Sequence, residues 1–221
     1  MNIEKINYKG NPNIGVFMFS NDKITLVPKD TDDKILNIVA KVLGSRVLRI
    51  TLGGMNIVGI FVAGNNKGLL LSPLVREDEY RLIKSSFDGN VAIVKTRFTA
   101  VGNVILVNDR AAYVHPDAFD ELKNYVKEYL EVEIVEKGTI AEIPTVGSAA
   151  YVNNIGGIVH PEASDREIEY LSNLFGVKMD VGTVNFGIGF IRSGLVGNNR
   201  GLLVGDRTTG PEIMRISKIF G

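Results

Sequence analysis

The feature that most constrains the fold of this chain is a sequence unit that recurs five times. An asparagine within a predicted tight turn marks each copy, at Asn21, Asn65, Asn108, Asn153 and Asn198. By subtraction, successive asparagines lie 44, 43, 45 and 45 residues apart. A fixed period of this length is the signature of a repeat architecture, in which one supersecondary unit is placed against the next. The repeat therefore decides the architecture, which the length of 221 residues alone leaves open.

Two further positions keep a fixed register relative to the turn asparagine. A glycine stands six residues before it in four of the copies: Gly15, Gly59, Gly102 and Gly147. In the fifth copy this place is taken by Arg192. A proline stands seven or eight residues after the asparagine in the same four copies: Pro28, Pro73, Pro116 and Pro161. Departures in the last copy are expected, because terminal repeats are atypical.

Each copy contains the same order of predicted elements. A short apolar strand, such as residues 104–107, leads into a tight turn of the kind that Asn and Gly favour. A second strand follows, as at 111–114 and 201–204, and then a helix with apolar residues at three- and four-residue spacing. Capping-box pairs open two of the helices: Ser164 with Glu167, and Thr209 with Glu212. A third strand is predicted in four of the copies, at 47–51, 91–95, 132–135 and 177–181.

The missing strand of the fifth copy is expected at the other end of the chain. The sequence stops at Gly221, directly after the last predicted helix, while residues 3–8 have the alternating character of a strand. An N-terminal strand that completes the last unit would close the array and remove its exposed sheet edges. The prediction is one α/β domain over residues 1–221, a five-bladed ring. Its repeats are 14–54, 55–100, 101–144, 145–188, and 189–221 plus 1–13.

Composition excludes several classes of function. The chain has no cysteine, which removes disulfides, thiolate nucleophiles and cysteine-based zinc sites. Lys plus Arg and Asp plus Glu are both 25, so the chain lacks the basic excess of a general DNA binder, and any contact with RNA should be local. No apolar run is long enough to span a bilayer, and the N-terminus has no apolar signal core. We therefore expect a cytoplasmic protein with neither DNA nor a membrane as its partner.

Two glycine-rich turns resemble phosphate-binding loops. They are residues 64–68 and 197–201, with Lys67 and Arg200 as basic groups that could contact a polyanion. Neither ends in the Lys-Ser/Thr pair of a P-loop, and both lead into a strand instead of a helix. A hairpin turn is therefore the favoured interpretation.

The histidines and the carboxylates give little support for catalysis. His115 and His160 occupy equivalent repeat positions, so a structural place at a strand end explains both. Acidic clusters at residues 30–33, 77–79 and 117–121 fall at predicted helix starts, where they complement the helix dipole, and we interpret them as solvated. No clustered third and fourth ligand accompanies the histidines, so the sequence predicts no metal and no cofactor.

Several segments, taken in order on the fivefold repeat, resemble translation initiation factor 6 in its archaeal form. They are residues 64–70, 102–104, 108–109 with 114–117, 156–161 and 182–185. The resemblance implies a pentein-type five-bladed α/β propeller with a central channel. It also implies a monomeric, non-catalytic factor that binds the large ribosomal subunit near the sarcin–ricin loop, through ribosomal proteins and local ribosomal RNA. Such a factor prevents premature joining of the small subunit, and the resemblance extends to a role in subunit maturation.

The same resemblance places the ribosome-binding residues just after the repeat glycines, at one end of the ring. Asn103 matches the family pattern. Ile60 stands where eukaryotic relatives carry a basic residue, and Ala149, next to Ser148, stands where an aromatic is expected. Three residues of one turn, which can belong to the opposite rim, are further candidates: Asn65, Asn66 and Lys67.

Two rival functions stay open at the level of the sequence. The same ring supports enzymes that act on guanidino groups, but these resemble one another in a cysteine nucleophile, which this chain lacks. A different hydrolytic use of His115 or His160 has no supporting motif. The second rival is a ring that only scaffolds other proteins.

Overall fold

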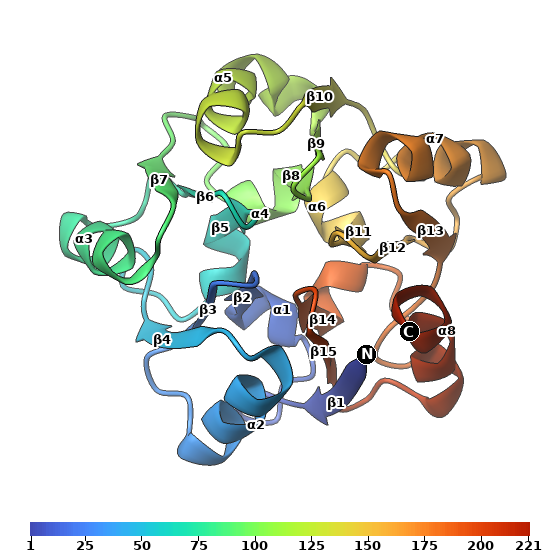
Figure 1. The fold of residues 1–221 in the computed structure, drawn as a ribbon, viewed down its shortest axis with the longest axis horizontal. Coiled ribbons are helices and arrows are strands. Elements are labelled where there is room, and N and C mark those ends of the chain that lie inside the picture. The colour runs from blue at the N-terminus through green and yellow to red at the C-terminus, as the bar shows by residue number, and fades with distance from the viewer.

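The computed structural model describes residues 1–221, whose elements form five similar units around a central axis (Figure 1). Each unit contains one three-stranded sheet. Its first two strands form an antiparallel hairpin, and its third strand runs parallel to the second; in four of the units a helical crossover connects these two strands. The fold is therefore mixed α/β with five sheets, in agreement with the five copies in the sequence.

The strands follow the order that the repeat predicts. The hairpins are β2 (Phe19–Ser20) with β3 (Ile24–Pro28), β5 (Val62–Gly64) with β6 (Gly68–Leu71), β8 (Ile105–Val107) with β9 (Ala111–Val114), β11 (Ala150–Val152) with β12 (Gly156–Val159), and β14 (Leu195–Gly197) with β15 (Gly201–Gly205). The third strands are, in the same order, β4 (Arg46–Ile50), β7 (Asn90–Ile93), β10 (Ile134–Lys137), β13 (Lys178–Val181) and β1 (Asn2–Ile6).

The predicted pairing of the N-terminal strand with the last unit is confirmed. Strand β1 lies parallel to β15 in a continuous register that runs from Asn2 opposite Gly201 to Ile6 opposite Gly205. The first strand of the chain thus supplies the third strand of the last sheet. Because β1 covers one side of β15, the two ends of the chain are joined by main-chain hydrogen bonds without a disulfide.

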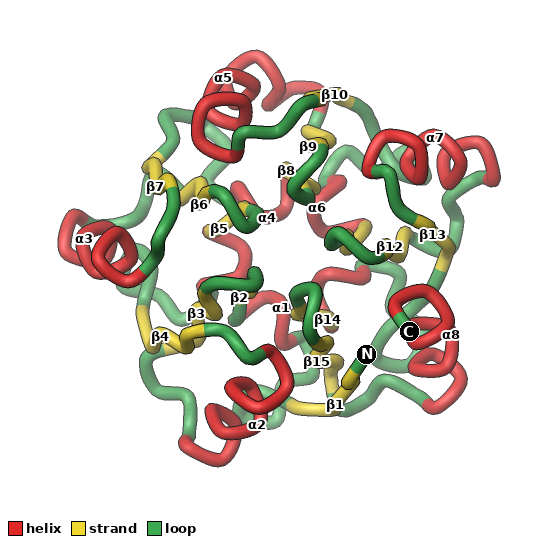
Figure 2. The backbone as a smooth tube through the Cα atoms, viewed as in Figure 1, coloured by secondary structure: helices red, strands yellow, loops and turns green.

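Long helices form the outside of the ring, and short ones lie close to its axis (Figure 2). The long helices are α2 (Asp33–Leu43), α3 (Glu77–Ser86), α5 (Phe119–Leu130), which follows η2 (Pro116–Ala118), α7 (Asp165–Phe175) and α8 (Gly210–Phe220). The short helices are α1 (Ile14–Phe17), η1 (Val58–Phe61), α4 (Val101–Val104), α6 (Val146–Ala149) and η3 (Ile191–Gly194).

Each long helix packs between its own sheet and the sheet of the preceding unit. The core around α3, for example, joins Ile83 of that helix to Leu26 of β3 and Leu69 of β6, all fully buried. The core around α2 joins Val39 to Leu203 of β15, which belongs to the last unit. A single unit therefore cannot bury its helix alone, and apolar burial of this kind favours the complete ring over separate units.

The structure corrects three details of the sequence prediction. Val104 belongs to α4 and not to a strand, because the chain forms a short helix before each first strand. The third strand of the third unit is β10, two residues later than predicted, because Glu131 ends α5 in a left-handed conformation. Glu79, in an acidic cluster interpreted as solvated, is only 5% exposed. The capping boxes at Ser164 and Thr209 are confirmed.

Candidate functional site

The five short helices form one end of the ring, which we call the helix face. Each repeat glycine on it lies against the backbone of the preceding short helix. A methyl group at Gly59 would lie 2.0 Å from the carbonyl oxygen of Gly15, and one at Gly147 would lie 2.2 Å from that of Gly102. Real side chains do not approach a backbone so closely. The glycines therefore allow the five helices to pack into one tight ring, and they direct the next residue of each helix toward the axis.

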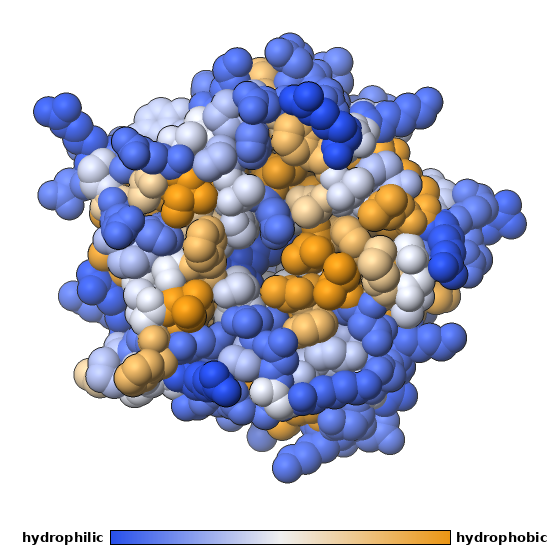
Figure 3. Space-filling view, turned by 180° about the vertical axis from the view of Figure 1, so that it is seen from behind, coloured by the Kyte–Doolittle hydropathy of each residue, from blue (hydrophilic) through white to orange (hydrophobic).

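The helix face is hollowed at its centre by about 340 Å³, and we call this hollow the bowl. Its lining consists of Asn13, Gly15, Val16, Ile60, Asn103, Ser148, Ile188, Phe190, Arg192 and Ser193. Figure 3, which shows the molecule from the side opposite to Figure 1, has apolar residues gathered beside a central hollow. Phe190 and Ile188 remain 44% and 43% exposed. An apolar concave surface with a few polar groups is typical of a binding site.

The structure brings together three of the seven residues that the sequence selected. Ile60, Asn103 and Ser148 hold equivalent places on neighbouring short helices and line the same bowl. The Ser148 hydroxyl donates to the carbonyl oxygen of Thr145 at 2.7 Å, whereas the Asn103 amide has no partner within the protein. Ala149 is fully buried, so its side chain adds nothing to this surface.

The other three predicted residues lie at the opposite end of the ring, which carries the five turns and which we call the turn face. Asn65, Asn66 and Lys67 belong to one of these turns, and the main-chain bond from Asn65 N to Gly68 O, at 3.0 Å, confirms a hairpin in place of a phosphate cradle. The predicted residues therefore do not form one continuous surface.

The first asparagine of each turn closes a hydrogen-bonded ring around the axis. Each side-chain amide donates to the carbonyl oxygen of the equivalent asparagine in the next unit. The five bonds are Asn21 to Asn65 (2.7 Å), Asn65 to Asn108 (3.2 Å), Asn108 to Asn153 (3.4 Å), Asn153 to Asn198 (2.9 Å) and Asn198 to Asn21 (3.1 Å). The same residues are 3–8% exposed. They mark the repeat because each one joins two units, and so they are structural.

The basic residue of the turn also acts between units. Lys67 Nζ donates to the carbonyl oxygen of Glu131, directly after α5, at 2.8 Å. Lys23 Nζ donates likewise to Asp88 O beyond α3, at 2.6 Å. The Arg200 guanidinium donates to Gly44 O at the end of α2. Cations at helix C-termini complement the helix dipole, so these groups are directed to the protein itself and not to a polyanion.

Loops that precede the short helices border the helix face, and buried or half-buried carboxylates fix them. Glu79 accepts hydrogen bonds from Gly53 N at 2.7 Å and Gly54 N at 2.9 Å, while Glu212 accepts from Phe186 N at 3.2 Å and Gly187 N at 2.9 Å. Burial would raise the pKa of Glu212, but donors from Thr209, Gly187 and Thr183 overcome it and lower the pKa to about 2. The carboxylates thus stay ionised and hold the loops in place.

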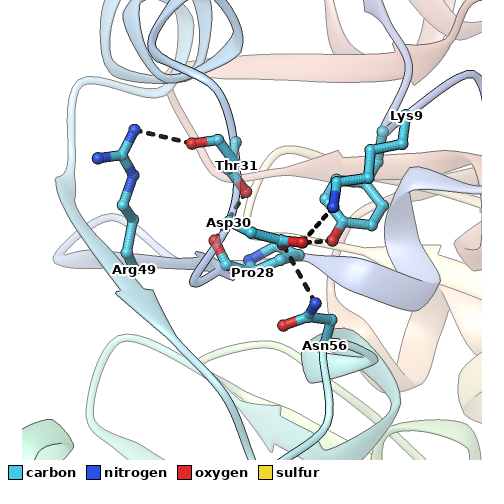
Figure 4. A network of polar contacts seen from close by, with 7 residues as sticks. Lys9, Pro28, Asp30, Thr31, Arg49 and Asn56 are labelled. Atoms are coloured by element: carbon cyan, nitrogen blue, oxygen red, sulfur yellow. Dashed lines mark hydrogen bonds and ion pairs between the residues drawn. The ribbon is translucent and has the colours of Figure 1, made fainter.

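In the first unit Ile35 stands at the helix position of this glutamate, and Asp30, which precedes the helix, holds the loop instead (Figure 4). The Asp30 carboxylate accepts from the Tyr8 hydroxyl at 2.5 Å, from the Lys9 ammonium, and from Asn56 Nδ2 of the second unit at 3.1 Å. Burial of Tyr8 and the hydrogen bond from its hydroxyl to Asp30 raise the pKa of Tyr8 to about 12. The network attaches the N-terminal loop to two units, so Asp30 belongs to the framework of the helix face.

Arg192 occupies the fifth glycine position and fills the axis below the bowl. Its Nη2 donates to the carbonyl oxygens of Val62 at 3.1 Å and Gly59 at 3.4 Å, on another unit of the ring. Its guanidinium carbon lies 5.9 Å from the centre of the Phe19 ring. Burial lowers the pKa of Arg192 to about 10, so the side chain remains a cation at neutral pH. In the sequence, Arg192 stood out only because it replaces the repeat glycine in the fifth copy.

The histidines and the remaining acids do not assemble a catalytic site. His115 and His160 each follow a strand, and their Nδ1 atoms accept from Asp117 N at 3.0 Å and Glu162 N at 3.3 Å. No three His, Asp or Glu side chains converge as a metal-binding group. No helix combines the length and the apolar character that crossing a bilayer requires.

Most polar groups of this repeat ring form hydrogen bonds within the protein, and one end of the ring has a partly apolar hollow. These features are typical of a binding protein. The model of the eIF-6 family matches residues 3–219. The chain therefore belongs to the eIF-6 family, a family of translation factors and not of enzymes. The rival assignment to guanidino-group enzymes has no support from this family.

Named relatives agree with the family match. Translation initiation factor 6 of Saccharolobus solfataricus (strain P2) is 43% identical over 147 residues, which cover 66% of this chain and 66% of that protein. The protein of the same name from Sulfolobus acidocaldarius is also 43% identical with the same coverage. That of Methanocaldococcus jannaschii is 40% identical over 144 residues, or 63% of this chain and 62% of that protein. The matched stretch thus spans slightly less than two thirds of these relatives.

Proposed function

We propose that this protein is a translation initiation factor 6 that binds the large ribosomal subunit through its helix face and prevents premature association with the small subunit. Family membership and the names of the archaeal relatives support the assignment. The single observation that carries the choice of surface is that Ile60, Asn103 and Ser148, each selected from the sequence, line one bowl. No nucleophile or metal is needed, because a factor that blocks subunit joining acts through bulk and affinity.

The proposal extends to the oligomeric state, the location and the ribosomal partners of the protein. The protein acts as a monomer in the cytoplasm, as one pentein-type five-bladed propeller with the repeat boundaries given above. It contacts ribosomal proteins near the sarcin–ricin loop, and the same docking serves during subunit maturation. A neutral chain with an apolar hollow fits a largely protein–protein interface, since RNA binding would favour a basic surface.

Co-sedimentation with separated ribosomal subunits tests the proposal. The wild-type protein should sediment with large subunits and not with small ones, and it should reduce the fraction of joined ribosomes when small subunits are added. Asn103→Arg fills the bowl with a long side chain, whose bulk should weaken binding at least about tenfold, a loss of about 1.4 kcal/mol. Asn124→Arg, at an exposed position of α5 on the outside of the ring, is the matched control and should bind normally. Wild-type protein that ignores large subunits would refute the function, and full binding by Asn103→Arg would refute the surface.

A further inference from the structure

One cation in the bowl lacks a carboxylate partner. The structure contains six ion pairs, and Arg192 takes part in none of them. Its only acceptors are two carbonyl oxygens, both reached through Nη2. Nε and Nη1 of Arg192 have no acceptor within the protein. Every fully buried side-chain nitrogen of the protein, in contrast, has a hydrogen-bond partner. These two nitrogens therefore face accessible space.

The space above Arg192 carries no competing negative charge. Of the ten residues that line the bowl, Arg192 is the only charged one, and none is Asp or Glu. The compartment on the other side of Arg192, at the turn face, already contains Asp22 and Asp109. Those carboxylates accept hydrogen bonds from Asn66 and its neighbours and would repel another anion. An anion that pairs with Arg192 must therefore enter through the bowl.

The surroundings of Arg192 favour a protein carboxylate over an RNA phosphate. A phosphate backbone is bound by several cations together, but the bowl offers one. Its walls include Val16, Ile60 and the exposed Phe190, which suit the apolar part of a polypeptide. A hydrogen bond from a guanidinium to a carboxylate is charge-assisted and short, and Nη1 of Arg192 is free to donate one because only Nη2 is bonded within the protein.

We infer that the bowl receives an acidic side chain of the partner protein that docks on the helix face, and that Arg192 is its charge partner. The inference rests on the proposed ribosomal function and makes it more specific, because it names the chemistry at the centre of the interface. The four other units have glycine at this position, so the anchor is a single asymmetric point in a fivefold surface. It would fix the rotational register of the ring on its partner.

The first arm of the test measures affinity for purified large ribosomal subunits. Arg192→Gly installs the residue that the four other units carry, so the ring is expected to fold, and a thermal melt checks this. It should lower affinity by roughly 10–100-fold and reduce the salt dependence of binding. Asn103→Arg separates the two proposals. If that variant loses binding while Arg192→Gly binds like wild type, the helix face is right and the charge pairing is wrong. If wild-type protein does not bind large subunits, the ribosomal function itself fails.

The second arm identifies the partner group. Arg192→Lys keeps the positive charge and introduces an amine that a carbodiimide couples to a nearby carboxylate, with loss of water and formation of an amide. The inference predicts a cross-link from position 192 to an Asp or Glu of a ribosomal protein, located by mass spectrometry. A cross-link to Asp22 or Asp109 of the same chain would show that the side chain faces the other compartment and would overturn the inference. Ultraviolet cross-linking of position 192 to ribosomal RNA, without a carboxylate product, would overturn it in favour of a phosphate.

Discussion

The asparagine ring at the turn face should be a main determinant of stability, and Asn65→Ala tests this. Asn65 is 5% exposed, and its side chain makes four hydrogen bonds. Its Nδ2 donates to Leu130 O at 2.8 Å and to Asn108 O at 3.2 Å, and its Oδ1 accepts from Lys67 N at 2.9 Å and Gly68 N at 3.0 Å. The substitution leaves two donors and two acceptors of the main chain without these partners.

The cost follows from the number of groups affected. A net hydrogen bond contributes about 1 kcal/mol, and a buried group without a partner costs about 1–3 kcal/mol. Some of the four groups can be reached by water from the axial compartment, so we expect a total loss of about 3 kcal/mol. This is a large fraction of the roughly 5–15 kcal/mol by which typical domains are stable.

Urea unfolding at 25 °C, followed by circular dichroism, measures the free energy of unfolding of wild type and variant. Asn124→Ala, at an exposed helix position, is the control and should change stability by less than about 0.5 kcal/mol. Asn65→Asp keeps the acceptor but turns the donor into an oxygen that faces Leu130 O and Asn108 O, so it should be at least as damaging at pH 7. A loss below about 1 kcal/mol for Asn65→Ala, or a wild-type stability for Asn65→Asp, would refute the reasoning.

Three further predictions concern the loops and the helix ends. Glu212 has a folded-state pKa of about 2, below its ordinary value of 4.5, so it stabilises the fold above about pH 5 and this contribution is lost as the pH falls toward 2. Glu212→Gln should cost about 1–2 kcal/mol at pH 7 and flatten the acid limb of a plot of stability against pH; an unchanged limb would contradict the assignment. Ala141 has a φ of 49°, a left-handed conformation that strains a side chain, so Ala141→Gly should stabilise the protein by up to about 1 kcal/mol in the same urea assay, and a loss would argue against strain. Lys67→Met should cost only about 0.5 kcal/mol, and less in high salt, because it removes one partly exposed cation from the end of α5.

The sequence was sufficient to predict the architecture because the repeat is expressed in local signals. Turn asparagines, capping boxes and alternating strands each depend on residues a few positions apart, and their fivefold recurrence implied the ring and its closure by β1. The short helices were missed because four residues are too few to show an apolar period. The burial of Glu79 was missed because its partners, Gly53 and Gly54, lie about 25 residues away along the chain.

The site was predicted only in part, for a related reason. Equivalent positions of a ring must lie at the same end, so the register of Ile60, Asn103 and Ser148 already implied a common surface. The register did not say at which end the turn residue Asn65 lies, because that depends on the path of the chain between helix and turn. Arg192 was visible as an exception to the glycine pattern, but its reach across the axis is a contact between units and has no local signature.

The two ends of the ring differ in what their polar groups are free to do. At the turn face, the asparagine amides and basic side chains are already bonded to neighbouring units, so a partner would have to compete with the fold for them. At the helix face, glycine contacts between backbones hold the ring together instead, which leaves the amide of Asn103 and two nitrogens of Arg192 without acceptors in the protein. A rigid surface that presents free donors loses little conformational entropy on binding. This difference supports the proposal that recognition takes place at the end where packing, and not hydrogen bonding, closes the ring.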